Sequence, residues 1–205
     1  MITFTGISVM MDNEEAPNLT DIAVSLGRLP RFCGHTLQWW PVLAHSLAVY
    51  DILNEVGART ETLLYGLLHD AHESVFGDIP RTWKTPLYKD LGKSLDSRIF
   101  TKLGLRGFPA FDAEERVHRA DELALVHEVY TVGNVEIRKY FASEHLLLER
   151  PLSIIAKRAY QVRNAKETVM ALRSPMVHEF IQTADTLIKA LIRDGSAFPG
   201  PNTLR

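Results

Sequence analysis

Apolar residues recur with the helical period along most of this chain, from Asn18 to about Arg193. Residues of the segment 61–76 show the pattern well, with apolar side chains at the 3, 4, 7 spacing of a buried helix face. Together with the glycines, prolines and capping residues that bound each periodic stretch, the pattern predicts helices over 19–27, 41–56, 61–76, 85–103, 112–131, 139–148, 153–172 and 176–193. The chain is therefore predicted to be all-α, with little or no sheet.

The stretches between these helices have other signatures. Residues 1–17 resemble a short strand or hairpin arm, and residues 28–40 and 78–84 contain Pro and Gly without helical period, so both are predicted to be loops. Residues 196–205 are rich in turn formers. We expect an N-terminal arm over 1–17, one helical domain over 18–195 and a C-terminal tail over 196–205.

Composition adds limits rather than a function. With 205 residues, 46% hydrophobic and 23% charged, the chain can form one globular domain. A net charge of −2 gives no general attraction to nucleic acid or anionic membranes, so we expect no stable nucleic-acid partner, and any phosphate site must be a local cluster. Cys33, the only cysteine, excludes an internal disulfide and a Cys-based zinc site. No apolar run is as long as a membrane-spanning helix requires. The apolar N-terminal residues also lack the basic start of a signal peptide, so a cytoplasmic protein is expected.

The strongest chemical signal is the segment LHDAHE, residues 68–73, near the end of an apolar helix pattern. Burying these polar groups beside leucines is costly unless they are paired or bind a metal. His69 and Asp70 diverge by about 100° around a helix, yet a metal at the helix edge can take one atom from each. Glu73 lies four residues after His69, on the same face, where it can reach a metal-bound water. A solvated helix end with a capped histidine is the alternative.

Two further residues extend this signal. His45 lies among apolar residues of one predicted helix, and Asp121 lies inside another. Taken singly, each is more typical of a core histidine or a solvated aspartate. Taken jointly, three helices present His, His-Asp and Asp in that order, and two imidazoles with two carboxylates suit zinc, manganese, iron, cobalt or nickel.

This order, H…HD…D, resembles that of the HD-domain phosphohydrolases. The likeness extends to LGRLPRFCGH (26–35), VLAHS (42–46), HDAHE (69–73) and GDIP (77–80), and covers about residues 19–125. These segments resemble a compact HD subgroup that includes bacterial 5′-deoxynucleotidases and small phage proteins. Some of the phage members are dATP triphosphohydrolases of viruses that replace adenine with 2-aminoadenine. The resemblance implies an HD-type helical bundle.

It also implies roles for residues at matching positions. The metal ligands would be His45, His69, Asp70 and Asp121. Glu73 and Asp78 would form the acidic pair that handles the water and the proton of the leaving group, and Arg31 would hold phosphate. Phe32 stands where the bacterial nucleotidases have a tryptophan, so base contacts there are expected to differ.

The same loops carry further candidates for substrate binding. His35, His72, Arg81 and Lys84 could contact a polyphosphate, although Arg81 and Lys84 could equally belong to a solvated loop. A ring of Phe32, Pro80 or Trp83 could stack on a base, whereas Trp39 and Trp40 are expected in the core. The basic run of Lys157, Arg158, Arg163 and Lys166 is predicted to be a solvated helix face, with an oligomer interface as the alternative.

The prediction for function is metal-dependent hydrolysis of deoxynucleotides, preferably of dATP to deoxyadenosine and triphosphate. A 5′-deoxynucleotidase acting on dNMPs is the first alternative, and a metal-binding regulatory module without turnover is the second. Hydrolysis of cyclic nucleotides or alarmones is a weaker alternative for the reaction. The expected cofactor is a divalent metal, Zn, Co or Mn, with Mg as a candidate at an accessory site. The resemblance also implies a homo-oligomer, in the host cytoplasm if the chain is phage-encoded.

Overall fold

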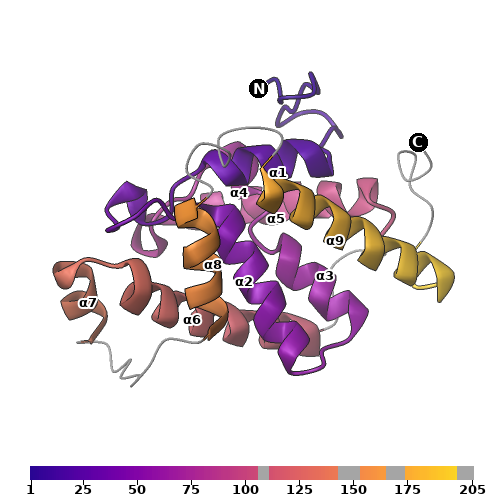
Figure 1. Ribbon diagram of the computed structural model, residues 1–205. Helices are drawn as coiled ribbons and strands as arrows, with labels where there is room; N and C mark the ends of the chain where they lie inside the picture. The colour runs from indigo at the N-terminus through magenta and orange to yellow at the C-terminus, as the bar shows by residue number, and fades with distance from the viewer. Residues whose placement is uncertain (106–110, 143–152, 165–173, 198–205) are drawn as a thin grey trace.

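A computed structural model describes residues 1–105, 111–142, 153–164 and 174–197 (Figure 1). Within these ranges the chain forms helices and isolated β-bridges but no strand, which confirms the all-α prediction. The elements in order are α1 (Leu19–Arg28), η1 (Arg31–Gly34), α2 (Val42–Glu55), α3 (Thr60–Leu68), α4 (Glu73–Phe76), η2 (Arg81–Trp83), α5 (Pro86–Lys102), α6 (Phe111–Val132), α7 (Val135–Ala142), α8 (Ser153–Asn164) and α9 (Pro175–Arg193).

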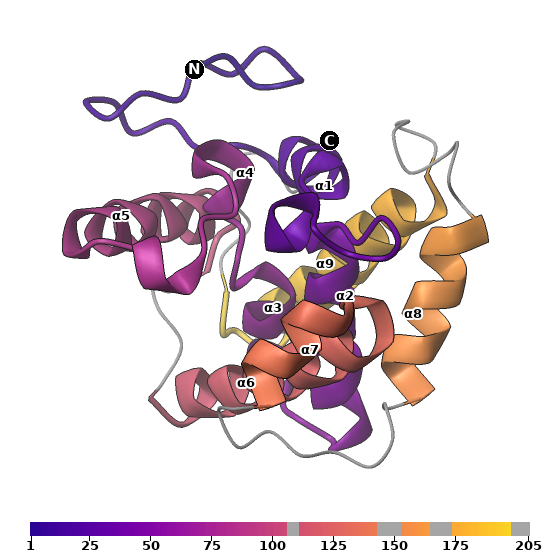
Figure 2. The same cartoon turned by 90° about the vertical axis from the view of Figure 1, so that its left-hand side faces the viewer.

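Helix α2 forms the centre of the bundle and is contacted by α1, α3, α6, α8 and α9. Figure 2 shows α4 and α5 on one side of this centre and α8 on the other. Every residue of 42–49 is buried, including His45 and Ser46. A helix buried on all sides leaves its side chains little room to move. His45 is therefore fixed by the core itself.

The predicted helix 61–76 is wrong in one respect, because the chain turns between α3 and α4 over residues 69–72. In the turn, Ala71 N–H donates to the Leu68 carbonyl at 2.9 Å and Glu73 N–H to the Asp70 carbonyl at 3.0 Å, a three-residue spacing. The His69 ring donates from Nδ1 to the Gly66 carbonyl at 2.8 Å, and so competes for the acceptor that a continuing helix would use. Ala71 is buried all the same, which is why the apolar spacing did not reveal the break.

Other helix ends differ by smaller amounts. Thr60 begins α3, one residue before the predicted start, with Arg59 as N-cap, and Pro41 is the N-cap of α2 rather than its first residue. Asp112, the first residue of the predicted helix 112–131, lies in the first turn of α6, where it pairs with Arg59 at 2.7 Å. Thr85 does cap α5, accepting from the Tyr88 N–H. The predicted stretches 143–148 and 165–172, and tail residues 198–205, lie outside the described residues.

In the N-terminal arm, Ile2 pairs antiparallel with Ser8 through an isolated β-bridge. Two basic residues of α5 hold the arm. Arg98 donates to the Asn13 carbonyl at 2.5 Å, and Lys102 donates to the Ala16 carbonyl at 2.6 Å. The arm therefore covers one side of α1 and α5.

The basic run on α8 is only partly a solvated face. Lys157 and Arg163 are exposed, as predicted, but Arg158 is 1% exposed. Its guanidinium pairs with Asp51 of α2 at 2.6 Å and with Glu179 of α9 at 2.8 Å. The prediction is wrong for Arg158 because two carboxylates on neighbouring helices compensate its burial. Trp40 is fully buried, as predicted, and Trp39 packs against the core.

Candidate metal centre and active site

The four predicted metal ligands converge from three places in the fold. α2 supplies His45, α6 supplies Asp121, and the turn after α3 supplies His69 and Asp70. The two Nε2 atoms of the histidines lie 3.3 Å apart. Asp70 Oδ2 is 3.2 Å from Nε2 of His69 and 3.6 Å from Nε2 of His45. Donor atoms of these three residues all lie within 4.8 Å of one another.

Asp121 lies at the edge of this group. Its Oδ1 is 3.0 Å from Nε2 of His45 and 3.9 Å from Nε2 of His69. The break in the predicted helix explains how adjacent residues join the group. Because the chain turns at His69, both side chains of the His-Asp pair can point to one place, which a straight helix would make difficult.

The second ring nitrogen of each histidine is already engaged. His45 Nδ1 lies 2.8 Å from Glu128 Oε1, and His69 Nδ1 lies 2.8 Å from the Gly66 carbonyl. Since both acceptors need a donor, the neutral rings carry their protons on Nδ1 and turn the lone pairs of Nε2 toward the centre. Two lone pairs facing carboxylate oxygens are an arrangement that a divalent cation satisfies. The donor set therefore fits a metal such as zinc.

The pKa values of the group point the same way. Burial and the charge of Arg31 push the pKa of His45 down, but Glu128 and Asp121 outweigh them and raise it to about 10. Burial pushes the pKa of Asp121 up, yet the two histidines lower it to about 2. Both shifts mean that the cluster attracts positive charge. A bound metal ion would supply that charge in place of protons.

Arg31 approaches the cluster from η1. Its Nε lies 3.1 Å from Glu128 Oε2 and its Nη1 lies 3.8 Å from Asp70 Oδ2. The turn that carries it is strained, because Phe32 (φ 54°) and Cys33 (φ 51°) both adopt the left-handed conformation. On the other side of the arginine, its backbone N–H donates to the Trp40 carbonyl at 2.9 Å. The guanidinium is thus held next to the candidate metal position.

Glu73 opens α4 and is 2% exposed. Lys84 Nζ donates to its Oε1 at 2.8 Å, while Oε2 is buried and has no hydrogen-bond partner among the described residues. Burial first, and then the charge of Asp70, raise the pKa of Glu73 to about 7 in spite of Lys84. Burial also raises the pKa of the half-buried Asp78, which interacts electrostatically with Arg31 and Asp70. The pKa of Glu73 therefore suits proton transfer near neutral pH, and the pKa of Asp78 is shifted in the same direction.

The remaining predicted residues are not gathered at the cluster. His72 turns to α5, where its Nδ1 lies 3.0 Å from Asp96 Oδ2. The side chain of Arg81 is 76% exposed and pairs loosely with Glu122, and His35 and Pro80 are also exposed. Phe32 is half-buried, with the Arg31 guanidinium over its ring. The phosphate contacts predicted for His35, His72 and Arg81 stay predictions.

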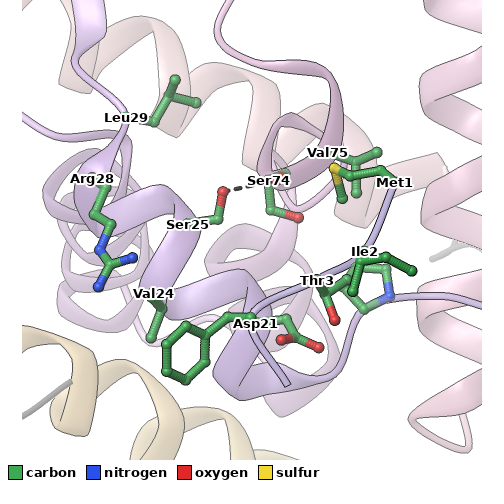
Figure 3. A pocket seen from close by; sticks show the side chains of 12 residues that line it. Met1, Ile2, Thr3, Asp21, Val24, Ser25, Arg28, Leu29, Ser74 and Val75 are labelled. Carbon is green, nitrogen blue, oxygen red and sulfur yellow. Dashed lines mark hydrogen bonds between the residues drawn. The ribbon is translucent and has the colours of Figure 1, made fainter. Parts of the chain in front are cut away.

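A cavity of about 430 Å³ lies elsewhere, between the arm, α1 and α4 (Figure 3). It is lined by Phe4, Asp21 and Arg28 among others, and by Ser74 and Val75 of α4. None of the predicted site residues lines it. The candidate site is therefore defined by its converging side chains rather than by this cavity.

Glu128 of the site was not predicted from the sequence, and neither was Asp96, which lies outside the cluster and holds His72. Glu128 follows Asp121 by seven residues, two helical turns, and so lies on the same face of α6, a signal that was visible but unused. Asp96 is buried on α5 and fixes His72 through both its ring and its backbone N–H. Nothing in the local sequence distinguishes Asp96 from a solvated helical aspartate.

Comparison with known proteins gives limited similarity. No family model matches the chain. The uncharacterized protein YfdR of Escherichia coli K12 is 33% identical over 107 residues, which are 50% of this chain and 57% of that protein, so the match spans little more than half of the relative. The solved structure of the cyanophage S-2L HD phosphohydrolase DatZ, bound to dA and one catalytic Zn²⁺ ion, superposes with a TM-score of 0.48 and 19% identity. That alignment covers 79% of this chain and 100% of that one. The residues of the candidate site therefore carry the evidence for function.

Proposed function

We propose that this chain is a metal-dependent phosphohydrolase of the HD class that acts on deoxynucleotides. The observation that carries the proposal is the convergence of His45, His69, Asp70 and Asp121 beside Arg31, with Glu73 close enough to interact electrostatically with Asp70. A purely structural metal site would need the ligands alone. A guanidinium beside them and a buried carboxylate with a raised pKa are what phosphoryl transfer to water needs.

The chemistry follows from the roles of these side chains. When bound, a divalent metal polarises a phosphoryl oxygen and makes a water molecule more acidic. Glu73, whose pKa is raised to about 7, accepts the proton of the attacking water. The water oxygen forms a bond to phosphorus, and the bond from phosphorus to the sugar oxygen breaks. Asp78, with its pKa raised by burial, gives a proton to the leaving sugar oxygen.

Arg31 stabilises the charge that grows on the phosphoryl oxygens. Ion pairs hold its guanidinium in place, with Nε 3.1 Å from Glu128 Oε2 and Nη1 3.8 Å from Asp70 Oδ2, and a guanidinium can bind two phosphoryl oxygens at once. Zn, Co and Mn all suit the donor set of two imidazoles and two carboxylates.

For substrate we propose dATP, cleaved at the α-phosphorus to deoxyadenosine and triphosphate. This choice rests on the motif resemblance, and on Lys84, whose ammonium group lies 2.8 Å from Glu73 Oε1 and could contact an outer phosphate. It also agrees with the bound dA named for DatZ.

A 5′-deoxynucleotidase is the second candidate, and one observation favours it. Of the cationic groups expected to hold a polyphosphate, Lys84 is bound to Glu73 and His72 to Asp96. Arg31 is then the cationic group that lies beside the candidate metal position. A monophosphate substrate would need no further cationic side chain.

A nucleotide panel tests both candidates. Purified protein is incubated with each dNTP, dNMP and rNTP in Zn²⁺, Co²⁺, Mn²⁺ or Mg²⁺, and the products are separated by chromatography. Deoxyadenosine and triphosphate from dATP would support the first candidate, and turnover of dNMPs alone would support the second. The Glu73→Gln variant controls for contaminating phosphatases. Metal binding without turnover of any substrate would favour the regulatory module.

A further inference from the structure

Glu128 lies beside the candidate metal centre, where it contacts both His45 and Arg31. It is fully buried on α6, two helical turns after Asp121. A buried carboxylate is costly unless other groups compensate it. Its partners therefore indicate why it is there.

Each oxygen of Glu128 faces a different functional residue. Oε1 accepts a hydrogen bond from His45 Nδ1 at 2.8 Å, and Oε2 lies 3.1 Å from Arg31 Nε. The partners come from α2 and from η1, two elements that precede α6 and are far from it in the sequence. One side chain thus joins a predicted metal ligand to the predicted phosphate ligand.

We propose that Glu128 is a positioning residue that couples metal binding to phosphate binding. Toward His45, its carboxylate keeps the proton on Nδ1, so that the lone pair of Nε2 is available to a metal and the ring cannot rotate away. Toward Arg31, its Oε2 forms an ion pair with the guanidinium, 3.1 Å from Nε, and so holds the arginine beside the candidate metal position, where a guanidinium can bind phosphate oxygens.

The strained turn under Arg31 makes the second role necessary. Phe32 and Cys33 hold left-handed conformations that bulky side chains avoid. Such a turn persists only when neighbouring contacts fix it. The pair with Glu128 fixes the side chain, as the bond to the Trp40 carbonyl fixes the backbone.

The test compares Glu128→Gln with Glu115→Gln, an exposed glutamate on the same helix. Zinc is titrated into the metal-free proteins without substrate, and inorganic phosphate is then titrated into the zinc-saturated proteins. We expect zinc affinity to fall about 10- to 100-fold in Glu128→Gln, as for other partners of metal ligands, and phosphate affinity to fall as well. Glu115→Gln should match the wild type in both.

A second pair of variants separates positioning from a general loss of structure. In an Arg31→Ala background, Glu128→Gln should still weaken zinc binding but should cause no further loss of phosphate affinity. A further loss there, or wild-type zinc affinity in Glu128→Gln, would overturn the proposal. If the Gln variant does not fold, Glu128→Asp keeps the charge but withdraws the oxygens, and the same outcomes apply.

The phosphate half of this inference rests on the proposed function, and the zinc half does not. Failure of the wild type to hydrolyse any nucleotide would remove the proposed function and leave both titrations interpretable. Conversely, an active wild type with zinc affinity unchanged in Glu128→Gln would remove only the role of Glu128.

Discussion

The two sides of the candidate site are built in different ways. On one side, His45 and Glu128 are fully buried on α2 and α6, and their positions are set by the packing of the bundle. On the other side, Arg81, Trp83 and Lys84 belong to the short segment around η2, and the side chain of Arg81 is 76% exposed. The core therefore fixes His45 and Glu128, whereas Arg81 and Trp83 are exposed in the segment around η2. Substitutions on the two sides should have different effects, on metal content for the first and on substrate handling for the second.

The largest effect is expected from His69→Ala on the buried side. The variant loses an imidazole from a group whose donor atoms lie within 4.8 Å of one another, so zinc content and hydrolysis should both fall to background. Zinc is measured by elemental analysis and activity on the substrate found in the nucleotide panel. His118→Ala, which removes an exposed imidazole from α6, should keep both. Full zinc content in His69→Ala would exclude His69 as a ligand.

Glu73→Gln should separate catalysis from metal binding. Loss of a general base lowers kcat by roughly 10²- to 10⁴-fold, while zinc content should stay at the wild-type level. Because the pKa of Glu73 is raised to about 7, the wild type should lose activity as the pH falls below neutrality and the base becomes protonated. The remaining activity of Glu73→Gln should not show this loss at low pH. The same loss in the pH–activity profiles of both proteins would show that another group is the base.

A smaller effect is expected from Lys84→Met on the η2 side. The ammonium group, 2.8 Å from Glu73 Oε1, lowers the pKa of that carboxyl group, so its removal raises the pKa further. The loss of activity on acidification should then begin at a higher pH, so that activity at pH 7 is reduced. Lys89→Met, on the exposed face of α5, is the matched control. A uniform loss of activity at every pH would instead favour a direct role of Lys84 in binding phosphate.

The smallest effect on stability is expected from Trp83→Ala. Its side chain is 76% exposed, so the free energy of unfolding should change by less than about 0.5 kcal/mol, and zinc content should not change. Trp40→Ala, at a fully buried position, should cost about 3–5 kcal/mol. Denaturant unfolding of both variants measures the difference. An increase in KM for Trp83→Ala without loss of stability would support stacking of this ring on the base.

The sequence predicted the fold well wherever helical period was sufficient. The boundaries of α1, α5 and α9 agree with the predicted ranges to within a few residues, because Gly, Pro and capping residues mark them. The break after α3 could not be predicted in this way. At the break the ring of His69 donates a hydrogen bond to the Gly66 carbonyl, while the apolar spacing continues through Ala71.

For the candidate site, the sequence motif pointed to four predicted ligands that the fold brings together, and it gave no sign of residues that reach them only through helix packing. His45 and Asp121 lie 76 residues apart, yet the order of ligand types pointed to both. The contacts of Glu128 and Asp96 and the burial of Arg158 are set by the packing of neighbouring helices. Periodicity along one helix does not reveal that packing. The exposure of His35 and Arg81 is likewise a property of the folded loops.

The left-handed turn at Phe32 and Cys33 also has a consequence for local opening of the structure. A segment under strain has a lower free energy of opening than the helices around it, so amide protons near it should exchange with solvent sooner. The Arg31 N–H, bonded to the Trp40 carbonyl, lies at the edge of this turn. A phosphate bound to the guanidinium would hold the segment closed. Slower amide exchange at Arg31 would then report occupancy of the site in a protein whose catalysis has been disabled.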